Sequence, residues 1–139
     1  MLRLSILAAS LALVPRLEAQ TASLLGDWRG TSICVKADWN ASCNDEQIVY
    51  HVEPSKAGGK VLTLHAYKLV SGKPDWMGDI EFSPDSLPDH WFGEFSNPRV
   101  HIRWVFAVSG NALTGQLLIY PDMRVARNAT ATRDGPAPK

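Results

Sequence analysis

The sequence predicts an all-β fold, a single antiparallel up-and-down barrel of about eight strands. Three observations predict it. Apolar side chains recur at every second position from Val100 to Val108, which is typical of a strand with one buried face. Turn-forming Gly, Pro, Asn and Asp residues separate short segments of this kind. Beyond residue 20, no segment keeps the 3.6-residue period of a capped helix.

Eight segments are predicted as strands, with most of their boundaries set by turn residues. They are residues 28–35, 46–53, 60–70, 76–83, 90–95, 99–108, 112–120 and 124–132. The short connections favour antiparallel pairing of sequence neighbours, and closure into a barrel would remove the exposed sheet edges. A barrel of eight strands is just wide enough to be filled by side chains or to hold one small ligand.

Residues 1–19 are predicted to be a secretory signal peptide. Arg3 precedes an apolar run over residues 4–14, and the small residue Ala19 suits cleavage. An uncleaved membrane anchor is the alternative, but this run is too short for roughly 30 Å of hydrocarbon. We therefore expect an exported chain, periplasmic or extracellular, whose residues 20–139 form one barrel domain without a membrane span.

The charge balance argues against electrostatically driven partners. The 139-residue chain has a formal net charge of zero. Removing the predicted signal peptide, with Arg3, Arg16 and Glu18, leaves a charge near −1. Nucleic acid binding would lack its usual electrostatic driving force, so we expect none. We also expect the protein to be a monomer.

The two cysteines, Cys34 and Cys43, are predicted to form a disulfide between the first two strands across their turn. An even cysteine count is typical of disulfides in exported proteins. A redox-active pair is the alternative, but thiol oxidoreductases favour the Cys-x-x-Cys spacing.

The start of the first predicted strand resembles known barrel proteins. Gly26, Asp27 and Trp28, taken with Arg127 in the last strand, are similar to the lipocalin and calycin pattern. That resemblance implies that Trp28 closes one barrel end beneath Arg127, with Arg133 as the alternative partner. Residues 28–34, 43–46 and 49–50 also resemble a group of uncharacterised small exported bacterial proteins with lipocalin-like barrels.

No motif indicates catalysis, a metal site or a cofactor. The four histidines fall on four different predicted strands, and nothing in their spacing demands the three or four converging ligands of a zinc site. No Gly-x-Ser-x-Gly context marks a nucleophile. The paired carboxylates, Asp45 with Glu46 and Asp79 with Glu81, fit solvated turns and strands. We expect no enzymatic activity, no metal and no cofactor.

The leading hypothesis is a binding protein for a small apolar or amphipathic ligand held inside the barrel. Its predicted lining is Tyr67, Ile102, Trp104 and Phe106. The alternative is a protein-binding module such as a periplasmic protease inhibitor, with Trp39 or Trp91 exposed for recognition. A filled barrel with a structural role in the envelope is a further possibility.

Overall fold

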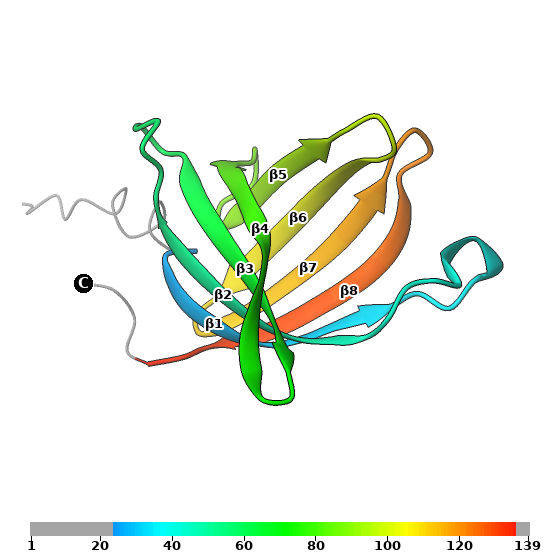
Figure 1. The fold of residues 1–139 in the computed structure, drawn as a ribbon. Coiled ribbons are helices and arrows are strands. Elements are labelled where there is room, and N and C mark those ends of the chain that lie inside the picture. The colour runs from blue at the N-terminus through cyan, green and yellow to red at the C-terminus, as the bar shows by residue number, and fades with distance from the viewer. Residues whose placement is uncertain (1–23, 136–139) are drawn as a thin grey trace, which may run out of the picture.

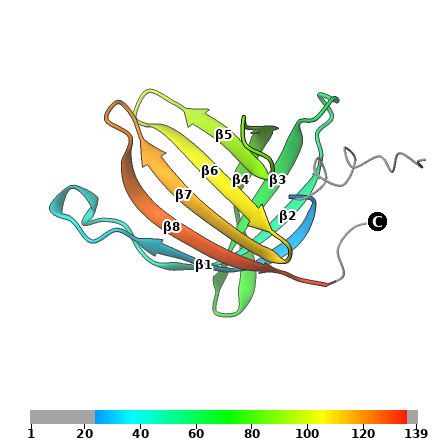
Figure 2. The same cartoon turned by 180° about the vertical axis from the view of Figure 1, so that it is seen from behind.

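The computed structural model describes residues 24–135, which form a closed barrel of eight antiparallel strands (Figure 1). Each strand pairs with its neighbours in sequence, and the last strand pairs with the first to close the barrel, as the view from behind also shows (Figure 2). The strands are β1 (Gly26–Cys34), β2 (Glu46–Pro54), β3 (Leu62–Val70), β4 (Lys73–Pro84), β5 (His90–Ser96), β6 (His101–Ser109), β7 (Ala112–Ile119) and β8 (Arg124–Arg133).

The predicted all-β class and up-and-down barrel are therefore confirmed. One 3₁₀ turn, η1 (Asp38–Asn40), interrupts the connection between β1 and β2. The predicted signal peptide lies outside the described residues. Within residues 24–135, no helix is long and apolar enough to cross a membrane.

The largest departure from the predicted strand boundaries is the start of β4. The sequence predicts a turn over residues 71–74, between the predicted strands 60–70 and 76–83. In the structure, Lys73 and Pro74 already pair with β3. The turn itself needs only Ser71 and Gly72, both of which have positive φ angles, 51° and 76°. Two consecutive residues of this conformation are typical of the tight hairpin turn that matches strand twist.

The alternation in β6 places its apolar side chains inside the barrel, where Phe106 and Val108 are buried. Gly115 on β7 leaves room for the Phe106 ring, because a Cβ atom there would lie 2.5 Å from it. A larger residue at this position would therefore displace the Phe106 ring.

The two ends of the barrel differ in how well side chains fill them. We call the end where β1 begins and β8 finishes the closed end, and the opposite end the open end. The buried core occupies the closed half and the middle of the barrel. It comprises Leu24, Trp28, Ile48, Tyr50, Val52, Leu62, Leu64, Phe82, Trp91, Phe106, Val108, Leu113, Ala129 and Ala131.

The wall of the barrel is weakest between β4 and β5. These two strands pair at two positions near the closed end, Ser83 with Phe92 and Pro84 with Trp91. Every other neighbouring pair of strands is in register over seven or more positions. Towards the open end, the backbone pairing between these two strands does not continue.

Candidate ligand-binding cavity

A cavity of about 300 Å³ lies in the open half of the barrel. Side chains from the inner faces of several strands line it, and most of them are apolar. The lining residues are Ser32, Glu46, Tyr50, Leu64, Ala66, Met77, Gly78, Asp79, Ile80, Phe82, Phe95, Ile102, Trp104, Phe106, Leu117 and Arg127. The volume lies at the lower end of the range for small-molecule sites.

Aromatic side chains separate this cavity from the filled half of the barrel. Phe106 stacks on Phe82 with ring centroids 4.7 Å apart, and Tyr50 stacks on Phe106 at 5.9 Å. Trp104 packs at a tilt against Phe106, with a centroid distance of 5.5 Å. These stacked rings form an apolar floor of the cavity.

The cavity lining includes exposed apolar residues on both β4 and β5. Met77 on β4 and Phe95 on β5 both line the cavity, and these residues are 41% and 45% exposed. The missing backbone ladder between these strands therefore coincides with the place where apolar side chains are open to solvent.

Three of the four predicted lining residues, Ile102, Trp104 and Phe106, meet in this cavity. Tyr67 is not among the residues that line it. Leu64 and Ala66 point into the barrel from β3, so the strand period of two turns Tyr67 to the outer face. Tyr50 on β2 is the tyrosine inside the cavity, and the alternation of Ile48, Tyr50 and Val52 was the signal that could have found it.

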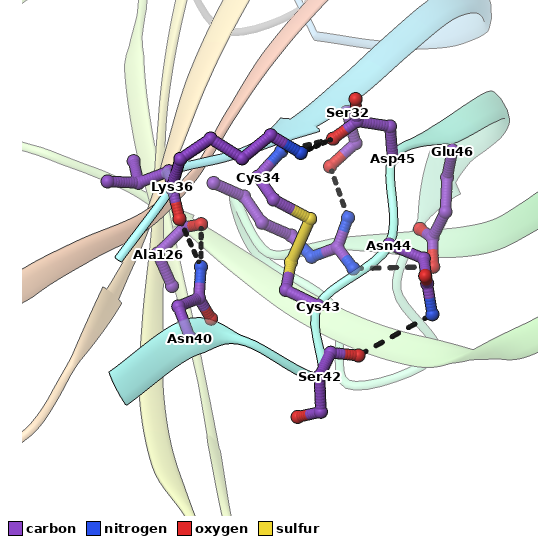
Figure 3. Close-up of a disulfide and its surroundings, with 12 residues drawn as sticks. Ser32, Cys34, Lys36, Asn40, Ser42, Cys43, Asn44, Asp45, Glu46 and Ala126 are labelled. Carbon is purple, nitrogen blue, oxygen red and sulfur yellow. Dashed lines mark hydrogen bonds and ion pairs between the residues drawn. A yellow bond between two sulfur atoms is a disulfide. The ribbon is translucent and has the colours of Figure 1, made fainter. Parts of the chain in front are cut away.

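The polar end of the cavity is formed by Arg127, Glu46 and Ser32. One nitrogen of the Arg127 guanidinium donates to Ser32 Oγ at 3.3 Å, and the other lies 3.5 Å from Glu46 Oε1. The Arg127 and Glu46 side chains are 15% and 21% exposed, while Ser32 is buried. Figure 3 shows Ser32 and Glu46 beside the disulfide.

Tyr50 adds a hydroxyl group to this region. The residue is 3% exposed and lines the cavity, and no described residue hydrogen-bonds its hydroxyl. Burial raises the pKa of Tyr50, and the nearby Glu46 charge raises this pKa further, whereas Arg127 lowers it. The hydroxyl of this cavity-lining residue is therefore neutral and able to donate.

A second, polar hollow of about 490 Å³ meets the cavity at Glu46 and Arg127. It is lined by Ser42, Asn44, Asp45, Glu46, Gln47, Lys68, Leu69, Val70 and Arg127. Glu46 and Arg127 line both spaces, so the ion pair stands at the boundary between an apolar interior and a polar surface.

The predicted disulfide is confirmed: Cys34 and Cys43 are bonded, with Cα atoms 6.0 Å apart. The bridge does not join two strands as expected, because Cys43 lies in the loop and β2 begins only at Glu46. Asn40 fastens this loop by donating to the carbonyl oxygens of Val35 and Ala126, at 2.8 and 2.9 Å. The loop therefore forms a fixed wall beside the polar hollow.

Asp45 also holds this loop in place. Its carboxylate accepts a hydrogen bond from the Cys34 backbone N–H at 2.8 Å. This bond is the main reason that the pKa of Asp45 is lowered, and Lys36, 3.6 Å away, lowers it further.

Trp28 closes the opposite end of the barrel, but beneath Arg133 rather than Arg127. Trp28 is fully buried, its indole N–H donates to the Leu24 carbonyl at 2.9 Å, and Arg133 Cζ lies 4.3 Å above its ring. The register explains the correction. Trp28 pairs with Arg133, whereas Arg127 pairs with Cys34 at the other end of β1. Gly26, at φ 110°, starts β1.

Outside the barrel, two histidines and three carboxylates form a hydrogen-bonded ladder across β1 to β4. His51 Nδ1 lies 2.6 Å from Asp27, and His51 Nε2 lies 3.4 Å from Glu53. His65 Nε2 also meets Glu53, at 3.1 Å, and His65 Nδ1 meets Asp79 at 2.7 Å. Within residues 24–135, no group of three or more His, Cys, Asp or Glu side chains is arranged to hold a metal ion.

The hydrogen bonds of this ladder shift the pKa values of His65, Glu53 and Asp79. Hydrogen bonds to Asp79 and then to Glu53 raise the pKa of His65. The bonds from His65 and His51 lower the pKa of Glu53. Asp79 has a lowered pKa because Trp76, and then His65, donates to it.

The two tryptophans considered for recognition differ. Trp91 is buried in the core, so it presents no surface to a partner. Trp39 is 41% exposed in the disulfide loop, where Arg124 Cζ lies 4.4 Å above its ring.

The comparisons with known proteins identify a similar fold. No family model matches the chain, and no curated protein sequence matches it. Among solved structures, the fold is similar to that in the crystal structure of Rv2717c from M. tuberculosis. The two chains superpose with a TM-score of 0.53 and share 13% sequence identity. The match covers 89% of this chain and 100% of that chain. The two proteins share a fold. At this identity, the likeness extends to the barrel architecture alone.

Proposed function

We propose that this protein is an exported, lipocalin-like, non-enzymatic binding protein for a small apolar or amphipathic ligand. The observation that carries the proposal is the cavity of about 300 Å³ behind Ile102 and Trp104, which is apolar over most of its lining and polar at one end. Concave apolar sites with a few placed polar groups are typical of small-molecule binding.

Energetics favour binding of modest strength. A ligand that buries about 200 Å² of apolar surface gains about 5 kcal/mol, at 25 cal/mol/Å². Immobilisation of the ligand opposes this gain. We expect dissociation constants in the micromolar range at best unless polar contacts add to the affinity.

Export is supported by the features of residues 1–19 in the sequence and by the disulfide, since such bridges persist mainly in oxidising compartments. A bridge between Cys34 and Cys43 in protein recovered from its own host would agree with this proposal. Two free thiols in that protein would contradict export.

A protein-binding module, such as a protease inhibitor, is the second candidate. Its supporting observation is Trp39, half-exposed on a loop that the disulfide and Asn40 hold in place. A cavity of this size favours the small-ligand hypothesis over the second candidate and over a filled structural barrel.

Tryptophan fluorescence tests the proposal. We would titrate fatty acids, isoprenoids and aromatic probes into the wild type, and into variants in which Trp104→Phe removes the reporter or Ala66→Phe reduces the cavity. Trp76→Phe, on the outer face, is the matched control. We expect a saturable change in the wild type and the control, a smaller signal in Trp104→Phe and weaker binding in Ala66→Phe. No saturable change with any probe would rule out interior binding.

A further inference from the structure

The polar end of the cavity carries an inference about the class of ligand, which rests on the proposed function. Three charged residues line the cavity, namely Arg127, Glu46 and Asp79. Asp79 is occupied on the outer face, where His65 and Trp76 hydrogen-bond to it at 2.7 and 2.9 Å. The charges available to a ligand are therefore those of Arg127 and Glu46.

The contact between Arg127 and Glu46 is loose. A guanidinium has five N–H donors in a planar fork and pairs best with both oxygens of one carboxylate. Here a single Glu46 oxygen lies 3.5 Å from one nitrogen, whereas a strong charge-assisted bond measures about 2.7–2.9 Å. Glu46 thus balances the charge of Arg127 but forms only one long contact with the N–H donors of the guanidinium.

Two residues with hydroxyl groups, Ser32 and Tyr50, line the cavity together with Arg127. Ser32 Oγ accepts a hydrogen bond from Arg127 and keeps its own hydrogen free to donate. Tyr50 also lines the cavity, and its hydroxyl makes no hydrogen bond to a described residue. The cavity therefore offers hydroxyl hydrogens, in addition to the N–H groups of Arg127, to the oxygens of an incoming anion.

The polar hollow gives the Glu46 carboxylate a place to move. Glu46 and Lys68 both line it, and no ion pair joins Lys68 to another residue within the described part of the chain. A carboxylate that leaves Arg127 would enter a solvated space beside an ammonium group, where its charge is well tolerated.

We propose that Glu46 is a displaceable counter-ion, and that the ligand is a medium-chain monocarboxylic acid whose carboxylate replaces Glu46 on Arg127 while its alkyl chain fills the cavity behind Ile102 and Trp104. The size follows from the volume. At about 30 Å³ per water-sized group, 300 Å³ accommodates about ten such groups.

The test is calorimetric titration with three ten-carbon probes of different charge at pH 7: decanoate, decan-1-ol and decyltrimethylammonium. We expect decanoate to bind the wild type at least tenfold more tightly than decan-1-ol, and the cation to bind most weakly. In Arg127→Met, decanoate should bind about as weakly as decan-1-ol. In Glu46→Gln, which removes the competing carboxylate, decanoate should bind several-fold more tightly than in the wild type.

Controls separate charge from folding. Arg127→Lys keeps the charge and should retain a preference for decanoate, and Glu53→Gln changes a carboxylate of β2 outside the cavity and should leave all three affinities unchanged. Equal affinity for decanoate and decan-1-ol in the wild type would overturn the inference and leave the proposed function standing. A preference for the cation, or unchanged decanoate affinity in Glu46→Gln, would also overturn it. Failure of all three probes would remove the proposed function as well.

Discussion

Two arginines on the inner face of β8, Arg127 and Arg133, show how differently the two barrel ends are built. Arg133 covers the ring of Trp28 and donates to the Leu25 carbonyl and to Asn111. Arg127 lies beside a cavity and makes two long contacts. The same residue type therefore covers the core at one end of the barrel and offers a charge to the cavity at the other end.

The difference arises from the volume of the neighbouring side chains. At the closed end, Trp28, Leu24 and Leu113 are buried and fill the interior. At the open end, inward positions hold small residues such as Ser32, Ala66 and Gly78. Small side chains at these positions leave the space that the closed end lacks, which indicates that the stability of the barrel resides mainly in one half.

Trp28→Ala should have the largest effect on the closed end of the barrel. Removing a fully buried aromatic side chain should cost about 3–5 kcal/mol of unfolding free energy. Urea denaturation followed by circular dichroism would measure it. The control Trp76→Ala removes an exposed tryptophan and should change stability by about 0.5 kcal/mol or less. A loss below about 1 kcal/mol in Trp28→Ala would show that the closed end is not the stable half.

The disulfide stabilises the open end. Replacing both cysteines, Cys34→Ser with Cys43→Ser, should cost about 2–3 kcal/mol, because the bridge restricts a short loop in the unfolded chain. Reduction of the wild type should reproduce the loss in the same denaturation experiment. Equal stability of the oxidised and reduced wild type would disprove this role.

The two arginines provide a matched pair of variants. Arg133→Met should cost about 1–3 kcal/mol, because it removes the contact with the Trp28 ring and two hydrogen bonds. Arg127→Met should cost less than about 1 kcal/mol, because its contacts are long and partly solvated. Chemical denaturation of both variants measures the difference, and equal losses would contradict the asymmetry.

The smallest effect concerns pH and the outer ladder. The raised pKa of His65 means that its contribution to stability is complete below the ordinary value of 6.5 and is lost as pH rises through the folded-state value. The lowered pKa values of Glu53 and Asp79 add stability above their ordinary values of 4.5 and 3.8, which is lost in acid. The ladder should therefore stabilise most between about pH 4.5 and 6.5.

His65→Gln isolates this effect. The variant should lower Tm by about 1–3 °C at pH 5.5 and by less at pH 8.5, as measured by differential scanning calorimetry. A larger loss at pH 8.5 than at pH 5.5 would show that the sign of the linkage is wrong.

The sequence predicts the strands and the inward-facing residues of β6 well, because both depend on local patterns. Turn residues set most boundaries, and alternation points Ile102, Trp104 and Phe106 inward without knowledge of any other strand. The start of β4 at Lys73 is less predictable, because it depends on how tightly residues 71 and 72 turn.

The site residues that sequence reasoning misplaced depend on long-range register. Arg127 and Arg133 lie on the same face of β8, and only the pairing of β8 with β1 decides which one meets Trp28. Tyr67 and Tyr50 lie on adjacent strands. To decide which of them lines the cavity, one must know which alternate residues of each strand face the barrel interior. Such pairings join residues distant in sequence, so local patterns do not determine them.

Methyl NMR during a decanoate titration tests most directly whether the open half of the barrel is a binding cavity while the closed half is filled. We expect the methyl signals of Ile80, Ile102 and Leu117, which line the cavity, to move together and saturate with one dissociation constant. The signals of Leu24 and Leu113, which are buried at the closed end, should stay nearly unchanged. Equal shifts at both ends, or no saturable shift at the cavity residues, would contradict a binding cavity in the open half alone.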